Sequence, residues 1–340
     1  MSFRDIKGHD KAIEILKGHI RESRLGNGYL FVGPEGIGKA MVAKTLAKAV
    51  NCQEETLDSC DKCASCLKIE KNQYPDVYMV NRSNSAAINP EQNNTDSPES
   101  SAIKIEHIRQ LQRDIILKPY EGRQKVFIID NAHNLTAEAS NALLKILEEP
   151  PPKSLIILVT AKPTLLFKTI ISRCKIIKFY PLARKELTDF LHKDYSVETN
   201  LAHYLAYFCE GRLGHALALK GKDILREKNR IIDTLVSLGQ PKFEDLSIKT
   251  REEVRSYLNI LATWFRDIYL IKIGMPYSEL INLDRKAELL RSMQQFSFVG
   301  LEQIFNCISN SIFYLQQNIN IRLLLSNLGE EIIYRANQAR

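Results

Sequence analysis

The strongest constraint on the fold of this chain is a phosphate-binding loop at residues 33–40, which read GPEGIGKA. Its spacing, G-x-x-x-x-G-K, is typical of loops that connect a buried strand to a helix and surround phosphates with backbone N–H groups. The apolar run 29–32 leads into the loop, and the helix-forming run 41–50 follows it. The motif therefore predicts an α/β fold with a nucleotide site formed by Gly33, Gly36, Gly38 and Lys39.

The loop lacks the residue that holds a metal ion in working sites of this kind. A hydroxyl after the lysine ligates Mg²⁺ there, whereas this chain has Ala40. A second strand-like run ends in Asp130, the usual carboxylate on the magnesium side, and Asn131 follows it. The amide of Asn131 can orient a water molecule but cannot accept its proton. These residues predict a degenerate site at which ATP or ADP could bind without being hydrolysed.

Apolar runs alternate with helix-forming segments through the first half of the chain. Continuous Ile, Val and Leu runs of this kind indicate a parallel sheet covered on both faces. A domain with this sheet is expected over residues 1–180, and Thr136 is expected to cap one of its helices. The predicted strands are Tyr29–Val32, Asp76–Val80, Lys125–Asp130, Leu155–Thr160 and Lys175–Phe179.

Strand-like runs stop after residue 180, and helical periodicity takes over. We expect a small helical domain at 181–222 and an all-helical domain at 223–340. In the latter, an apolar stripe of core residues is predicted at Tyr257, Leu261, Trp264 and Ile268. Residues 81–101 are rich in Asn, Ser, Pro and Glu, which predicts a mobile surface loop.

Four of the seven cysteines lie close together in the sequence, at Cys52, Cys60, Cys63 and Cys66. Spacing of this kind in a reducing compartment favours a closed tetrahedral Zn²⁺ site with a structural role. An iron–sulfur cluster and disulfide pairing are the alternatives. The remaining cysteines are isolated and are interpreted as small buried apolar residues, namely Cys174, Cys209 and Cys307.

Composition places the chain among ordinary globular proteins. Its 340 residues are 44% hydrophobic and 26% charged, and the net charge of +7 is dilute for this length. That charge permits contact with nucleic acid but does not require it. No apolar run is long enough to span a membrane and the first residues do not resemble a signal peptide, so we expect a cytoplasmic protein that makes no membrane contact.

Several motifs occur together in one order along the chain. The phosphate-binding loop is followed by the cysteine cluster, by Asp-Asn-Ala-His at 130–133, by NALLKILEEPP at 141–151 and by Ser-Arg-Cys at 172–174. This order resembles the bacterial clamp-loader subunits of DNA polymerase III, and among them the delta-prime type most closely. The resemblance covers about residues 1–220 and continues more weakly to 318–325, which are similar to the final helix of the family.

The resemblance implies an AAA+ architecture. Its parts would be a RecA-like domain with a zinc knuckle at 52–66, a helical lid and an all-α collar domain. It implies a hetero-pentameric ring with the tau/gamma motor subunits and delta, which loads the sliding clamp onto primer–template DNA at the replisome in the nucleoid. The complex would serve a DNA-directed DNA polymerase, while this subunit would not itself be an enzyme.

Three departures from the motor subunits favour the delta-prime, or stator, type. Besides Ala40 and Asn131, Gly214 occupies the position where the motor copies have a nucleotide-sensing arginine. The resemblance assigns Arg173 as an arginine finger that acts on the ATP site of a neighbouring subunit. The alternatives are a tau/gamma-like subunit with ATPase activity and a free-standing zinc protein that binds DNA.

Overall fold

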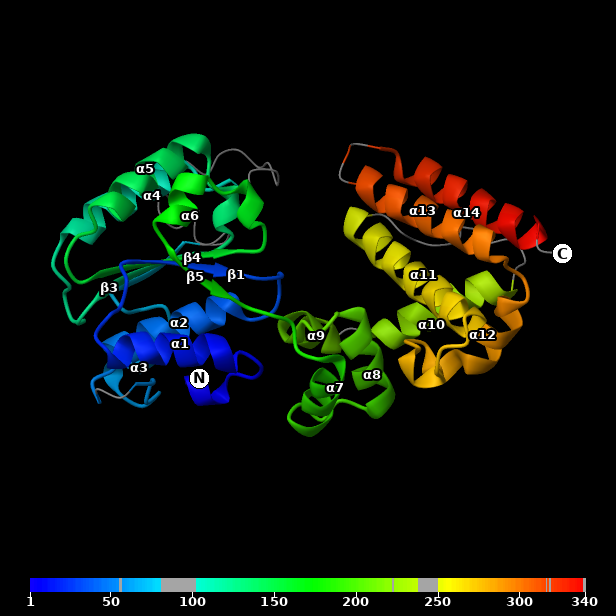
Figure 1. The fold of residues 1–340 in the computed structure, drawn as a ribbon, viewed down its shortest axis with the longest axis horizontal. Coiled ribbons are helices and arrows are strands. Elements are labelled where there is room, and N and C mark those ends of the chain that lie inside the picture. Colours follow the sequence, from blue (N-terminus) through cyan, green and yellow to red (C-terminus); the bar gives the residue numbers. More distant parts are fainter. Residues whose placement is uncertain are drawn as a thin grey trace. The chain divides into compact units, whose positions relative to one another are not determined.

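The computed structural model describes residues 1–54, 57–80, 102–221, 223–237, 250–315, 317 and 319–338. The predicted mobile loop at 81–101 lies outside the described residues. The chain forms two compact units (Figure 1). The first contains Met1–Leu182 and Arg212–Gly214, and the second contains Ala183–Gly211 and His215–Arg340. The predicted division into three domains stays a prediction.

The first unit is built on a parallel sheet with the strand order β2-β3-β4-β1-β5. Its strands are β1 (Gly28–Val32), β2 (Val77–Val80), β3 (Lys125–Ile129), β4 (Ser154–Thr160) and β5 (Lys175–Lys178). All five predicted strands are present, with ends that differ by at most one residue. Side chains of β3 and β4 are buried along their whole length, as expected for strands that are covered on both faces.

Helices cover both faces of this sheet (Figure 1). On one face lie α1 (Asp10–Arg21), α2 (Lys39–Asn51) and α3 (Ala64–Glu70); on the other lie α4 (Ile105–Ile116), α5 (Ala137–Glu148) and α6 (Lys168–Ser172). Because successive side chains of a strand point to opposite faces, Tyr29 and Phe31 pack in the first core and Leu30 in the second. Short 3-10 turns lie at η1 (Phe3–Asp5), η3 (Ala132–Asn134) and η4 (Pro163–Leu165).

The predicted cap of α5 is confirmed. The side chain of Thr136 accepts a hydrogen bond from the backbone N–H of Ala139 at 3.2 Å, which satisfies a donor in the first turn of the helix. The helix ends at Glu148, before the proline run that begins at Pro150. Local sequence thus determines where this helix begins and ends, and its end places Glu148 on the surface near Arg173.

The second unit is helical throughout its described residues. It contains α7 (Arg184–Lys193), α8 (Thr199–Phe208), most of α9 (Leu213–Lys220), α10 (Ile224–Ser237), α11 (Arg251–Lys272), α12 (Lys286–Met293), α13 (Phe298–Tyr314) and α14 (Ile321–Gln338). Two 3-10 turns precede α12, at η6 (Tyr277–Glu279) and η7 (Leu283–Arg285). The predicted apolar stripe is confirmed, because all four of its residues are buried in α11.

A buried carboxylate anchors the loop that precedes α12. Asp267 is fully buried and accepts hydrogen bonds from the backbone N–H groups of Ile281 and Asn282. Helix α8 contacts the same loop, because Nε2 of His203 donates a hydrogen bond to the carbonyl oxygen of Leu280 at 2.7 Å. These contacts explain why α8 and the later helices form one compact unit.

The fold class predicted from the sequence is confirmed: a parallel-sheet α/β domain with a four-cysteine cluster, followed by a helical region. In the part of the chain that the structure describes, no helix is both long enough and apolar enough to cross a membrane.

Candidate functional site

The phosphate-binding loop connects β1 to α2 at the carboxyl edge of the sheet. Gly36 and Gly38 have φ angles of +77° and +102°, a backbone region that glycine adopts without strain. Gly33 has no room for a side chain, because a Cβ atom there would lie 2.5 Å from the carbonyl oxygen of Phe179. The geometry of the loop therefore requires each of the three predicted glycines.

Lys39, the first residue of α2, is buried against the loop that precedes it. Its Nζ donates hydrogen bonds to the carbonyl oxygens of Gly33 at 2.8 Å and Pro34 at 2.6 Å. Burial lowers the pKa of Lys39, and the carboxylates of Asp130 and Glu35 oppose that change. These two hydrogen bonds use two of the three N–H donors of the ammonium group.

Asp130 and Asn131 lie just beyond the end of β3, as the sequence predicts. Oδ1 of Asp130 accepts a hydrogen bond from the backbone N–H of Asn131 at 2.9 Å, and Asn131 has a φ angle of +53°. The amide nitrogen of Asn131 donates to the other oxygen of Asp130 at 3.3 Å. The acceptors of Asp130 are thus engaged by its neighbour, and no carboxylate follows Asp130 that could take a proton from water.

Two further polar residues of this region do not stand out in the sequence. Thr160 ends β4 beside Val32, and its hydroxyl contacts Nδ1 of His133 at 3.1 Å. His9 is buried, and its Nε2 donates to the carbonyl oxygen of Ile37 in the loop at 2.6 Å. The position of Thr160 at a strand end is a signal that could have identified it, because ligands of parallel sheets bind at that edge. No local pattern identifies His9.

Gly214, in the first turn of α9, approaches the phosphate-binding loop closely. A Cβ atom at Gly214 would lie 2.7 Å from the carbonyl oxygen of Gly36. A larger residue would therefore have to displace backbone there. This close approach is a physical reason for glycine at the position where the resemblance expects an arginine in motor subunits.

Arg173 directly follows α6 and is paired within its own chain. One guanidinium nitrogen, Nη2, lies 2.8 Å from Oε1 of Glu148, and Nη1 donates to the carbonyl oxygen of Thr169 at 3.0 Å. The side chains of Arg173 and Glu148 are 36% and 50% exposed. Because Arg173 is on the surface, a neighbouring molecule can reach its guanidinium group.

The four clustered cysteines come together in space. Their Sγ atoms lie within 4.8 Å of one another. A tetrahedral zinc site with Zn–S bonds of about 2.3 Å needs sulfur atoms about 3.8 Å apart, so a small closure around an ion would complete it. The backbone N–H groups of Cys63 and Cys66 donate to the sulfurs of Cys60 and Cys63 at 3.2 and 3.5 Å. The cluster therefore fits a metal ion held by Cys52, Cys60, Cys63 and Cys66.

The local environment also favours a thiolate in this cluster. Burial alone would raise the pKa of Cys63, but N–H donors, including those of Cys66 and Gln53, lower it to about 7. No disulfide joins any of the seven cysteines, all of which lie among the described residues. Cys209 is buried as predicted, whereas Cys174 and Cys307 are only half-buried, because each lies at the edge of its core.

Comparison with known proteins identifies relatives over nearly the whole chain. A family model described as "DNA polymerase III, delta subunit" matches residues 8–183, and one described as "DNA polymerase III, delta subunit, C terminal" matches residues 225–328. DNA polymerase III subunit delta' of Bacillus subtilis is 30% identical over 337 residues, which cover 94% of each protein. The tau subunit of that organism is 30% identical over 68% of this chain and 40% of its own length. The structure of a DNA polymerase III gamma subunit-related protein from Thermotoga maritima covers 96% of this chain and 99% of its own, with a TM-score of 0.49 and 16% identity.

Proposed function

Because this chain belongs to the DNA polymerase III delta-subunit family, we propose that it is the delta-prime, or stator, subunit of a clamp loader. In this role it does not hydrolyse ATP itself. The observation that carries the proposal is the nucleotide site, which keeps Lys39 and Asp130 but has Ala40 and Asn131 at two positions that hydrolysis needs. The match to a delta' protein over 94% of both chains supports the same assignment.

The chemistry of the site supports a subunit without turnover. Ala40 has no oxygen atom for Mg²⁺, and Asn131 cannot act as a base toward the attacking water. Lys39 already bonds to the carbonyl oxygens of its own loop, so the loop is satisfied without a ligand. The phosphate-binding fold then serves to hold the shape of the subunit.

We assign Arg173 a role in the ATP site of an adjacent subunit. A guanidinium group is planar and permanently charged, so it can neutralise the charge that develops on a transferring phosphoryl group. Arginines that act in this way accelerate hydrolysis by roughly 10³–10⁵. The exposure of Arg173 and the weakness of surface ion pairs make its release from Glu148 easy.

We assign Zn²⁺ to the four-cysteine cluster, held by Cys52, Cys60, Cys63 and Cys66. When bound, the ion supplies a structural cross-link and no reaction chemistry, since four sulfurs leave no open position. Cys52 directly follows α2, whereas Cys63 directly precedes α3 and Cys66 lies in its first turn. The ion would therefore join the end of α2 to the start of α3.

The proposed partners are the tau/gamma motor subunits and delta, in a hetero-pentameric ring. Through that ring the subunit would act on the sliding clamp and on primer–template DNA. The similarity to proteins named delta' and tau supports these partners. In the assembled holoenzyme the chain would serve DNA-directed DNA synthesis.

Reconstitution with motor subunits, delta and a sliding clamp tests the function. We expect the isolated chain to show no ATP turnover above that of Lys39→Ala. We also expect it to co-purify with the other subunits and to be required for clamp loading on primed DNA. A complex that forms and loads clamps equally well without this chain would contradict the proposal.

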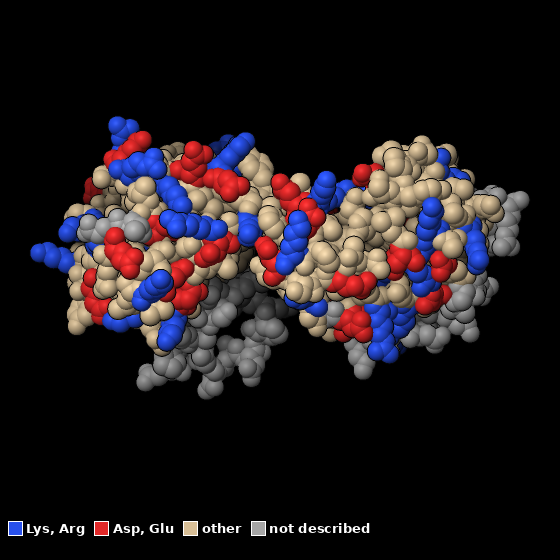
Figure 2. All heavy atoms as spheres, turned by 90° about the horizontal axis from the view of Figure 1, so that it is seen from below, with Lys and Arg blue, Asp and Glu red and all other residues tan. Residues whose placement is uncertain are grey.

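The second candidate is a tau/gamma-like subunit with slow ATPase activity. The retained Lys39 and Asp130 and the 30% identity to tau favour it. Steady-state turnover at motor-subunit rates by the purified chain would establish this alternative. A free-standing DNA-binding role has less support, because Lys and Arg are interspersed with Asp and Glu on the face drawn in Figure 2.

A further inference from the structure

A buried lysine joins the cysteine cluster to the sheet domain. Lys48 lies in the last third of α2, and only 1% of its side chain is exposed. Its ammonium group donates to the carbonyl oxygen of Met1 at 2.6 Å, to Oδ1 of Asp61 at 2.6 Å and to Oε2 of Glu70 at 2.7 Å. These contacts use all three donors of the ammonium group.

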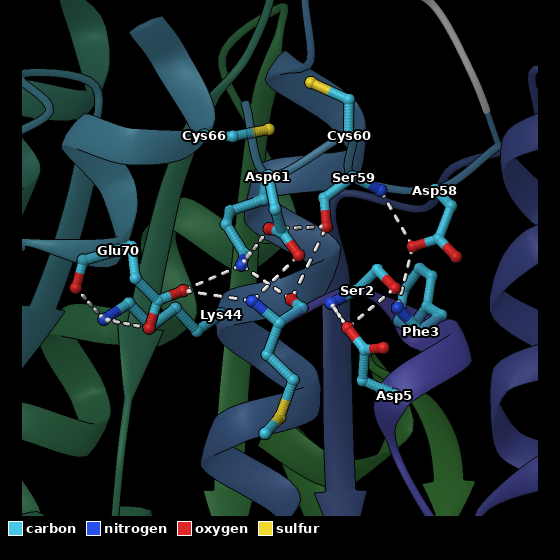
Figure 3. Close-up of polar contacts among 12 residues, drawn as sticks. Ser2, Phe3, Asp5, Lys44, Asp58, Ser59, Cys60, Asp61, Cys66 and Glu70 are labelled. Carbon is cyan, nitrogen blue, oxygen red and sulfur yellow. Dashed lines mark hydrogen bonds and ion pairs between the residues drawn. The ribbon is translucent and has the colours of Figure 1, made fainter. Parts of the chain in front are cut away.

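Both carboxylates that accept from Lys48 belong to the segment that carries the cysteines. Asp61 directly follows Cys60, and Glu70 ends α3, the helix that contains Cys66. Figure 3 shows the carboxylates of Asp61 and Glu70 directed toward the same ammonium group, with Cys60 and Cys66 on the segment that carries them. The two carboxylates that hold Lys48 therefore belong to the same short segment as three of the four metal ligands.

The first residues of the chain take part in the same set of contacts. The amino nitrogen of Met1 lies 2.8 Å from Oδ2 of Asp61. Oδ1 of Asp58 accepts hydrogen bonds from the backbone N–H groups of Phe3 at 2.7 Å and Ser59 at 2.8 Å, and the ring of Phe3 is buried (Figure 3). The N-terminal turn thus packs on the cysteine segment and not on the sheet alone.

The energetics make these contacts cooperative. A buried ammonium group is tolerated only while its acceptors stay in place, since an unpaired buried charge is strongly destabilising. The two charged acceptors lie in a short segment, residues 57–70, which carries three of the four cysteines and whose folding a closed metal site would support directly. Loss of the ion would therefore loosen the acceptors of Lys48, and loss of Lys48 would loosen the ligands.

We infer that Lys48 is a positioning residue of the metal site. It couples retention of the ion by the four cysteines to the order of residues 1–6 and of the second half of α2. The inference rests on the proposed metal site, and its experiment separates the two. A full chain that purifies without any metal contradicts the metal site, whereas a metal-loaded chain that does not depend on Lys48 contradicts only the coupling.

The test compares two lysine variants of the full chain. Lys48→Met removes the buried charge, and Lys68→Met is the matched control, because Lys68 lies in α3 but pairs with Glu121 on the surface. Zinc release is followed with a chromogenic chelator. We expect release from Lys48→Met to be about tenfold faster than from wild type or more, as outer-shell partners affect metal sites by 10–100-fold. Lys68→Met should release zinc at the wild-type rate. Equal rates in all three proteins would overturn the inference.

Hydrogen exchange supplies a second readout that general destabilisation would not reproduce. Removal of zinc from the wild-type chain should increase amide exchange at residues 1–6 and 44–51, with α5 unchanged as the internal reference. In Lys48→Met these regions should already exchange fast while zinc is present. Exchange at residues 1–6 that does not respond to zinc removal would contradict the coupling.

Two milder variants keep the inference testable if Lys48→Met does not fold. Asp61→Asn and Glu70→Gln each remove one charged acceptor from Lys48 and keep the shape of the side chain. Each should accelerate zinc release relative to Lys68→Met. Release from both at the wild-type rate would contradict the role of Lys48.

Discussion

Glu148 and Arg173 form an ion pair at the end of α5, with Oε1 and Nη2 2.8 Å apart. The arginine proposed to act on a neighbouring subunit is thus held by a carboxylate of its own chain. Both side chains are partly exposed, and surface pairs of this kind contribute only about 0–1 kcal/mol to stability. A more negative group, such as a nucleoside triphosphate, can therefore replace Glu148 as the ion-pair partner of Arg173.

We predict that Arg173→Ala slows clamp loading by the reconstituted complex. Folding, zinc content and ring assembly should stay normal, because the pair that is lost is exposed. Total ATPase activity stimulated by DNA should fall only in part, since other subunits supply their own arginines. Arg24→Ala is the matched control, because Arg24 also pairs with a surface carboxylate, that of Glu22. Normal loading by Arg173→Ala would exclude the role in trans.

Glu148→Gln tests the pair from the other side. The substitution removes the charge that competes for Arg173, so clamp loading should be as fast as in wild type or faster. Thermal unfolding should change by less than the equivalent of about 1 kcal/mol. If Glu148→Gln slows loading as much as Arg173→Ala, then the pair and not the free arginine is what the complex requires.

Metal analysis should find about one zinc ion per chain in protein purified without added zinc, as one closed tetrahedral site requires. Cys63→Ser should lose most of the metal and loosen residues 51–68. Cys307→Ser should keep it, because Cys307 is isolated in the helical unit. Metal-free protein with four freely reactive thiols would refute the site, and stoichiometric iron would indicate an iron–sulfur cluster.

Ala40→Ser should not restore ATP turnover. The added hydroxyl could ligate Mg²⁺, but Asn131 would still be unable to take a proton from water, and each defect costs on the order of 10²-fold or more. Steady-state hydrolysis by the isolated variant, beside a motor subunit purified in the same way, provides the measurement. Turnover at the rate of the motor subunit in either wild type or variant would contradict the degenerate site.

Stability should decrease as the pH falls below about 6.5, the ordinary pKa of histidine. Burial lowers the pKa of His9 in the folded chain, so the unfolded chain binds more protons in the window between the two pKa values. The stabilisation is thus complete above the unfolded pKa and is lost as the pH falls toward the folded one.

Chemical unfolding at pH 7.5 and pH 5.5 measures this effect. His9→Gln keeps a donor for the carbonyl oxygen of Ile37 but does not titrate, so it should lose less stability than wild type between these pH values. The stability of His9→Gln should still depend on pH to some extent, because burial also lowers the pKa of His19. If the free energy of unfolding of His9→Gln falls as much as that of wild type between the two pH values, then titration of His9 does not contribute to the pH dependence of stability.

Two glycine substitutions should have opposite effects. Gly33→Ala should destabilise the chain, because its Cβ would lie 2.5 Å from the carbonyl oxygen of Phe179. Gly18→Ala, within α1, meets no atom within 4 Å and should stabilise by about 0.5–1 kcal/mol, as alanine does in helices. Urea unfolding of both variants measures the two changes in the free energy of unfolding. If Gly33→Ala leaves that free energy unchanged, the loop and the end of β5 can move apart at little cost.

The local patterns of the sequence predict the elements that depend on neighbouring residues. Apolar runs specify the five strands, Thr136 specifies the start of α5, and the spacing of the cysteines predicts a cluster that the structure brings within 4.8 Å. Each of these signals acts over a few residues, where backbone geometry and side-chain chemistry decide the outcome.

Tertiary structure alone decided the contacts between distant parts of the chain. The pairing of Arg173 with Glu148, the three acceptors of Lys48 and the approach of Gly214 to Gly36 join residues from 13 to 178 positions apart. No periodicity encodes such pairs, because they arise only when strand order and helix packing bring the surfaces together. The sequence by itself thus determined the elements and the chemistry available at each site, whereas packing determined which groups are engaged and which remain free for a partner.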